Sequence, residues 1–132
     1  MDSNDALNRI LANLQNKYSL MNTIYSTTKE MKKSLEENFD DHIFAELLGK
    51  RQSAMNTVDG LDMQNRQLIA RLPQGLREKI GECLAPSGVT IVLDNPLQTN
   101  IFETSKRLFV LLRRTIEEDD ELNRRVKMVR SK

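Results

Sequence analysis

Apolar side chains recur every seven residues along three long stretches of this chain. In the first stretch the residues seven apart are Leu7, Leu14, Met21, Thr28 and Leu35. Such spacing places one apolar face on a helix, and that face requires another helix to cover it. The pattern predicts long amphipathic helices and favours a function based on contact between helices over catalysis.

The spacing predicts an all-α fold: an elongated antiparallel bundle, or coiled coil, of three long helices plus a short irregular segment. The helices are expected at residues 4–37, 41–72, 76–84 and 96–129. A short connection joins the first two helices, which predicts that they are antiparallel neighbours. A chain of 132 residues fits a single domain.

Capping residues define the predicted helix ends. Ser3 or Asn4 is expected to cap the first helix, and the Asp40-Asp41 pair is expected to cap the second. Asp94-Asn95-Pro96 predicts the start of the last helix, because Asp or Asn caps a helix and proline is pre-organised for the first turn.

The second helix combines a long apolar face with two glycines and one carboxylate. The residues expected on its apolar face are Phe44, Leu47, Leu48, Met55, Val58, Leu61, Leu68, Ile69 and Leu72. The period passes through Gly49 and Gly60 without a shift, so we interpret both as sites of close helix approach. Asp62 lies between Met55 and Ile69 in the same row, which predicts an ion pair with Lys or Arg at the edge of the core.

Residues 74–95 form the least regular part of the chain. Within them, residues 89–93 (VTIVL) have the composition of a strand, but the chain offers no second strand to pair with it. Three interpretations stay open: an extended apolar segment packed on the helices, continued helix, and pairing with another copy of the chain.

The last helix has an apolar face wider than one helical partner requires. One row contains Ile101, Leu108, Thr115, Leu122 and Val129, and a second row contains Phe102, Phe109 and Ile116. The excess predicts a surface that binds a helical segment of another protein. The predicted partner-binding residues are Ile101, Phe102, Leu108, Phe109, Leu112, Ile116, Leu122 and Val126. The alternative is that the short helix and residues 89–93 already cover the second row.

Charge and targeting signals indicate a cytoplasmic protein. Lys and Arg number 20 against 19 acids, and a net charge of +1 gives no electrostatic reason to expect nucleic acid or an anionic membrane as partner. The start, MDSND, resembles no secretory signal, and no apolar run approaches the roughly 20 residues of a membrane span. The single cysteine excludes an intramolecular disulfide and fits a reducing compartment.

The sequence contains few residues that could support catalysis. His42 is the only histidine, and Cys83 lies on an apolar face where an inert buried thiol is expected. No phosphate-binding glycine loop, HExxH or paired Cys-x-x-Cys motif is present. Asp62 and Asp119 lie in or beside apolar rows, but the Glu-x-x-His pairs of di-metal bundles are missing. We therefore expect no enzyme, no metal and no cofactor.

Two short stretches carry a resemblance to a known family. Residues 47–62 (LLGKRQSAMNTVDGLD) in the second helix and 116–126 (IEEDDELNRRV) in the last helix resemble flagellar export chaperones of the FlgN type. In that family the second helix often reads leucines, arginine, then isoleucine-aspartate-x-leucine-aspartate. The resemblance covers nearly the whole chain in helix layout, but only these stretches in residues.

The resemblance implies a small cytoplasmic chaperone. Such a chaperone binds the C-terminal helical region of hook–filament junction proteins and delivers them to the export gate, with substrate binding largely in its C-terminal part. Residues 89–93 depart from the family's pattern. Two alternatives remain: a homo-oligomeric coiled coil, such as a homodimer, and a regulatory adaptor that binds a different helix.

Overall fold

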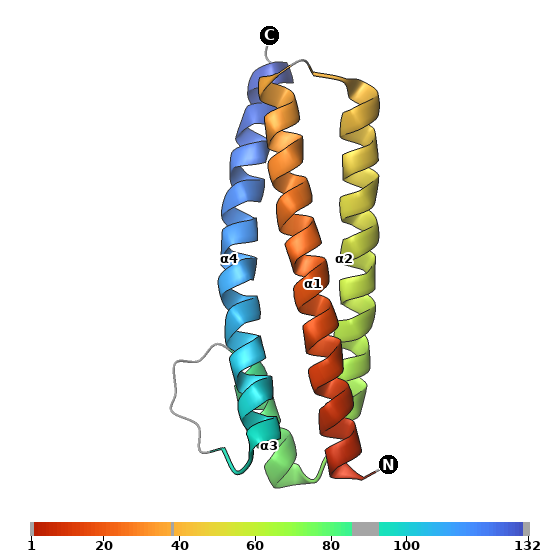
Figure 1. Ribbon diagram of the computed structural model, residues 1–132, viewed down its shortest axis with the longest axis vertical. Coiled ribbons are helices and arrows are strands. Elements are labelled where there is room, and N and C mark those ends of the chain that lie inside the picture. Colours follow the sequence, from red (N-terminus) through yellow and green to blue (C-terminus); the bar gives the residue numbers. More distant parts are fainter. Residues whose placement is uncertain (1, 38, 86–92, 131–132) are drawn as a thin grey trace.

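The computed structural model describes residues 2–37, 39–85 and 93–130 of the protein. Within these ranges it contains four helices and no strand (Figure 1). They are α1 (Ser3–Glu36), α2 (Asp41–Ala70), α3 (Gln74–Leu84) and α4 (Pro96–Arg130). The predicted all-α bundle is confirmed, and each observed helix end lies within two residues of its predicted place. Residues 89–92 of the strand-prone segment lie outside the described residues.

Helix α1 lies between the other two long helices and packs against both (Figure 1). It runs antiparallel to α2, as the ion pair between Lys17 and Asp62 and the contact between Thr28 and Arg51 show. It runs parallel to α4, because Lys32 pairs with Glu118 and the later residue Glu36 pairs with the later residue Arg125. The long helices therefore share one axis direction, with only α2 reversed.

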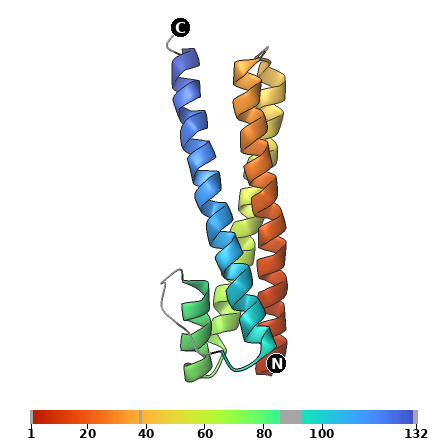
Figure 2. The same cartoon turned by 60° about the vertical axis from the view of Figure 1, so that its left-hand side comes forward.

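The four helices are arranged like the corners of a square. Helix α1 contacts α2 and α4, and α3 also contacts α2 and α4, but no Cα atom of α2 lies within 8 Å of one in α4, nor any of α1 within 8 Å of one in α3. This order of neighbours is that of a four-helix bundle seen in cross-section. Helix α3, however, accompanies only the lower end of the bundle, where the N-terminus lies (Figure 2).

The lengths of the helices leave much of the fourth corner without a helix. Helix α4 has 35 residues and α3 has 11, which correspond to about 52 Å and about 16 Å at about 1.5 Å per residue. Roughly two thirds of the fourth corner therefore has no helix of this chain beside it in the part that the structure describes.

The apolar core follows the two sides of α1. Its fully buried members come from α1, α3 and α4, since Ile10, Ile80 and Ile101 are all 0% exposed. The buried apolar residues of α1 are Ala6, Leu7, Ile10, Leu14, Met21, Ile24 and Met31. The heptad row predicted for the first helix is thus buried as far as Thr28, which donates its hydroxyl to the backbone carbonyl of Ile24 at 2.7 Å, whereas Leu35 is only partly buried.

The helix caps agree with the sequence at two of three places. The Oδ1 atom of Asp40 accepts hydrogen bonds from the backbone N–H groups of His42 (2.8 Å) and Ile43 (3.3 Å), as predicted. Asn95 caps α4 by accepting from the N–H of Gln98 at 3.0 Å. The cap of α1 is Asp2, not Ser3 or Asn4, because the helix begins one residue earlier and Asp2 Oδ1 accepts from the N–H of Asp5.

The predicted buried face of α2 is wrong in part. Val58 and Leu68 are buried, together with Ala54 and Asn65, which the apolar pattern did not select. Leu48 and Met55 are instead exposed, because the backbone of α4 stays more than 8 Å from that of α2. Helix α2 therefore buries a narrower stripe than its sequence offers.

Gly49 and Gly60 do not mark close helix approach. Helix α2 continues through both, as predicted, but a Cβ atom built on either glycine would meet nothing within 4 Å. Both positions face open space.

None of the helices in the described part of the chain is both long and apolar enough to cross a membrane.

Truncation of Ile10 tests the core. We expect Ile10→Ala to lower the free energy of unfolding by about 2–5 kcal/mol, because it removes a fully buried side chain from the helix that contacts both long neighbours. Ile43→Ala is the matched control, since Ile43 is 52% exposed, and it should change stability by less than about 0.5 kcal/mol. Urea unfolding followed by circular dichroism measures both. Equal losses in the two variants would contradict this packing.

The two open glycines predict stabilising substitutions. Gly49→Ala and Gly60→Ala should each raise the free energy of unfolding by roughly 0.5–1 kcal/mol, because alanine reduces the entropy of the unfolded chain and meets no neighbour in the helix. Thermal unfolding of the single and double variants measures this gain. A loss of stability in either variant would show that the position lies against another part of the molecule.

Candidate functional site

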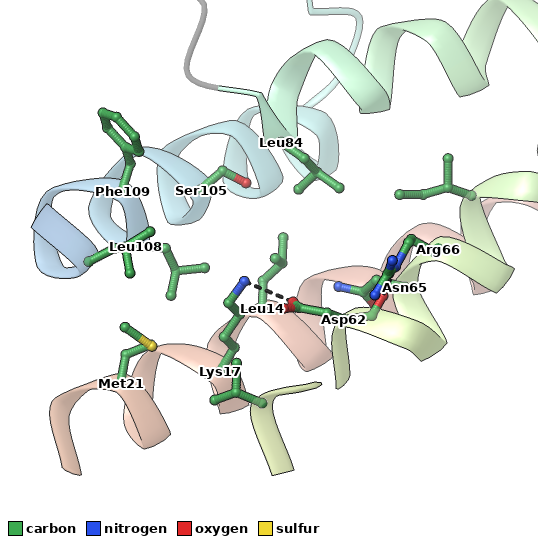
Figure 3. Close-up of a pocket in the computed structure, with 13 residues that line it drawn as sticks. Leu14, Lys17, Met21, Asp62, Asn65, Arg66, Leu84, Ser105, Leu108 and Phe109 are labelled. Atoms are coloured by element: carbon green, nitrogen blue, oxygen red, sulfur yellow. Dashed lines mark hydrogen bonds and ion pairs between the residues drawn. The ribbon is translucent and has the colours of Figure 1, made fainter. Parts of the chain in front are cut away.

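A groove of about 590 Å³ opens between α2 and α4, above α3. Its floor is formed by Leu14 and Met21 of α1 together with Leu108 of α4, and Leu84 of α3 closes its lower end (Figure 3). The remaining lining residues are Lys17, Val58, Asp62, Asn65, Arg66, Ile69, Ser105, Phe109 and Leu112. The groove is the open portion of the fourth corner.

An ion pair spans the corner further up the bundle. Arg51 of α2 reaches Asp119 of α4 with an N–O distance of 2.7 Å, and its guanidinium also lies 3.5 Å from the hydroxyl of Thr28 on α1. Along α4, the interval from Ser105 to Asp119 corresponds to about 21 Å, or about four helical turns. The groove's lining residues on α4, Ser105 to Leu112, occupy the lower part of this interval, and the whole interval up to the ion pair matches a helix of about 14 residues.

The structure divides the eight predicted partner-binding residues into three groups: buried, partly buried and exposed. Ile101, Leu108 and Leu122 are buried, and Leu108 reaches the groove only as part of its floor. These are core positions, because α4 turns this row toward α1. Phe102 and Val126 are partly buried.

The three remaining residues form the accessible apolar side of α4. Phe109 is 36% exposed, Leu112 is 42% exposed and Ile116 is 50% exposed. Phe109 and Leu112 line the groove directly, and Ile116 lies one turn beyond Leu112 on the same side of the helix. Helix α3 covers the lower part of the second apolar row and leaves this part open.

Helix α2 contributes a wall that the apolar pattern did not identify as part of a site. Val58 and Ile69 line the groove, and Met55 lies one turn from Val58 and is 42% exposed. Leu48 lies two turns further from Met55 on the same side. The signal for this wall was present in the sequence, since these residues belong to the predicted apolar face; what was missing was the distance between α2 and α4.

Polar contacts along this wall are specific. Lys17 Nζ lies 2.8 Å from Asp62 Oδ1, which confirms the predicted ion pair of Asp62 (Figure 3). Asn13 Nδ2 donates to Asn65 Oδ1 at 2.9 Å. On the opposite wall, Ser105 Oγ is a buried side-chain oxygen for which the described residues provide no hydrogen-bond partner.

The residues with possible catalytic roles are not brought together. Asp62 and Asp119 are each paired with a different cation, Lys17 and Arg51. Within the described ranges, no group of three His, Cys, Asp or Glu side chains could hold a metal ion. His42 is exposed at the start of α2, whereas Cys83 is buried in α3.

Burial controls the chemistry of the thiol. Removal from solvent raises the pKa of Cys83, the neighbouring Glu82 raises it further, and Lys79 opposes the shift. The thiolate is the nucleophilic form of cysteine, so this environment keeps the side chain neutral and unreactive.

Comparison of the chain with protein-family models, with curated proteins and with solved structures gave no match. The arrangement of helices and groove defines the class to which the molecule belongs: an open helical bundle with one corner only partly filled.

The buried thiol predicts slow labelling. We expect a disulfide reagent at pH 8 to modify Cys83 of the folded protein at a rate limited by unfolding, and the denatured protein rapidly. Since the folded-state pKa exceeds the unfolded one, stability should fall as the pH rises from the unfolded toward the folded pKa, and Cys83→Ala should remove this loss. Rapid labelling of the native protein would contradict the assignment.

Proposed function

We propose that this protein is a non-catalytic chaperone that holds an amphipathic helix of another protein in the groove between α2 and α4. The observation that carries the proposal is the open fourth corner with three accessible apolar residues, Phe109, Leu112 and Ile116, on the side of α4 that faces it. An amphipathic helix with apolar residues three and four apart would complete the four-helix bundle.

The walls of the groove leave apolar surface exposed to water. Apolar side chains at a groove between helices gain about 25 cal/mol for each Å² of area that a partner removes from water. The groove also offers a floor of three residues, Leu14, Met21 and Leu108, which are already held in place in the apolar core between α1 and its neighbours. A rigid apolar floor with accessible walls is the arrangement used in helix-in-groove recognition.

The resemblance of residues 47–62 and 116–126 to export chaperones of the FlgN type supplies a candidate partner. That partner is the C-terminal helical region of a hook–filament junction protein, which the chaperone would bind in the cytoplasm and deliver to the export gate. Two features of the fold support this proposal: the accessible residues lie in the C-terminal helix, and Arg51 and Asp119, which lie within the two stretches, pair across the corner that the partner would enter.

Removal of two apolar side chains from α4 tests the proposal. Phe109→Ala plus Ile116→Ala should weaken binding of the purified C-terminal helical region of a hook–filament junction protein by roughly 30-fold, corresponding to about 2 kcal/mol for anchor residues. The same variant should retain its helical circular dichroism, because both side chains are substantially exposed. Titration calorimetry measures the binding.

Val110→Ala plus Met63→Ala is the matched control. Both side chains are exposed and neither lines the groove, so this variant should bind like the parent protein. Unchanged binding by the Phe109/Ile116 variant together with a large loss of stability would show that these residues serve the fold. Failure of the parent protein to bind this segment would refute the flagellar partner.

A further inference from the structure

The two walls of the groove differ in chemistry. The α4 wall presents Phe109 beside Ser105, whereas the α2 wall presents Asp62, Asn65 and Arg66 (Figure 3) among the apolar Val58 and Ile69. A helix that fills the groove must therefore place apolar side chains against α4 and the floor, and must carry polar side chains opposite the three polar residues of α2. This asymmetry restricts how the helix is rotated about its own axis.

The polar residues on the α2 wall differ in whether they have a partner within the chain. Asp62 is neutralised by Lys17, and Asn65 accepts a hydrogen bond from Asn13. Among the described residues, in contrast, Arg66 makes only a long contact from its Nε atom to the backbone carbonyl of Asp62, at 3.5 Å within its own helix. In the described part of the chain, no carboxylate lies within 4 Å of its guanidinium.

We propose that the helix bound in this groove, on which the proposed function rests, is about four turns long and carries a carboxylate that pairs with Arg66. The guanidinium presents its N–H donors as a planar fork, which matches a carboxylate in a bidentate pair. Two cations and one carboxylate, Lys17, Arg66 and Asp62, line the groove, so one acidic side chain on the incoming helix balances the lining charge.

A cation at the α4 edge favours the same charge. The guanidinium of Arg113 lies 5.9 Å from the ring centroid of Phe109, which lines the groove. Arg113 is thus held beside a groove residue. An acidic helix would meet a cation on each wall, Arg66 on α2 and Arg113 on α4.

The length of the groove argues against a second copy of this chain as the occupant. Helices α1, α2 and α4 have 34, 30 and 35 residues, whereas the interval between α3 and the Arg51–Asp119 ion pair fits about 14 residues. The short helix α3 is already packed between α2 and α4 through Ile80 and Cys83. The occupant is therefore a short helix of a different protein.

A charge-reversal experiment tests the pairing. The probe is a phage-displayed library of 18-residue amphipathic peptides with a fixed apolar stripe of leucine and with every flanking position varied among Glu, Gln and Lys. The parent protein should enrich Glu at one flanking position, and Arg66→Glu should enrich Lys at that same position. Synthetic peptides that differ only there should show roughly tenfold tighter binding of the Glu form by the parent, reversed in Arg66→Glu.

Two controls separate the possible failures. Arg71→Glu makes the same change outside the groove, at the residue that follows α2, beside Arg9 and Asn13, and should keep the preference for Glu. Phe109→Asp should abolish selection altogether, because it places a charge on the apolar wall. Circular dichroism of each variant confirms that the helices are formed.

The outcomes are distinguishable. Groove-dependent peptides with the same residue preference for the parent and for Arg66→Glu would overturn the carboxylate pairing and leave the proposed function standing. No peptide whose binding depends on Phe109 would overturn both. A dimer measured by light scattering that Phe109→Asp dissociates would identify a second copy as the occupant and overturn this inference.

Discussion

The structure depends on α1 packing against two long helices at once. Ile10, Leu14 and Met21 lie on a helix with α2 on one side and α4 on the other, and the backbones of α2 and α4 stay more than 8 Å apart, linked by the Arg51–Asp119 ion pair. Burial of the apolar side chains of α1 is the dominant favourable term for the bundle. Because α1 covers one apolar stripe on α2 and another on α4, each of these helices buries apolar side chains without packing against the other.

The groove is a direct consequence of this arrangement. Where three helices form a triangle, each contacts the other two and no corner is left open. Here α2 and α4 both pack on α1 but lie at diagonally opposite corners of the square. The corner opposite α1 is filled by α3 only at its lower end. The apolar residues that α2 and α4 turn toward this corner, such as Met55 and Leu112, remain accessible above α3.

Ion pairs set the register of the long helices more than they stabilise them. Lys17–Asp62 aligns α2 with α1, Lys32–Glu118 aligns α4 with α1, and Arg51–Asp119 spans the corner between α2 and α4. Pairs that remain accessible to solvent, as these partly buried ones do, contribute only about 0–1 kcal/mol each. A shift of one turn would however leave partly buried charges without partners, which penalises the wrong alignments.

The sequence by itself determined the helices, their ends and the excess of apolar residues on α4. These features are local: heptad spacing, caps such as Asp40 and Asn95, and proline or glycine at the breaks act within a few residues. The sequence also indicated the ion pair of Asp62, because a carboxylate in an apolar row requires a cation. It did not indicate Arg66, which has no special spacing and gains its place only from the groove beside it.

Only the tertiary structure decided which apolar rows are buried. Leu48 and Met55 follow the same period as Val58, yet they are exposed because α4 packs on α1 instead of on α2. Ile101 and Leu108 belong to the predicted binding face, yet they turn toward the core and leave Phe109 and Ile116 accessible. Periodicity states that a face needs a partner, whereas the choice of partner depends on how all four helices share their apolar surface.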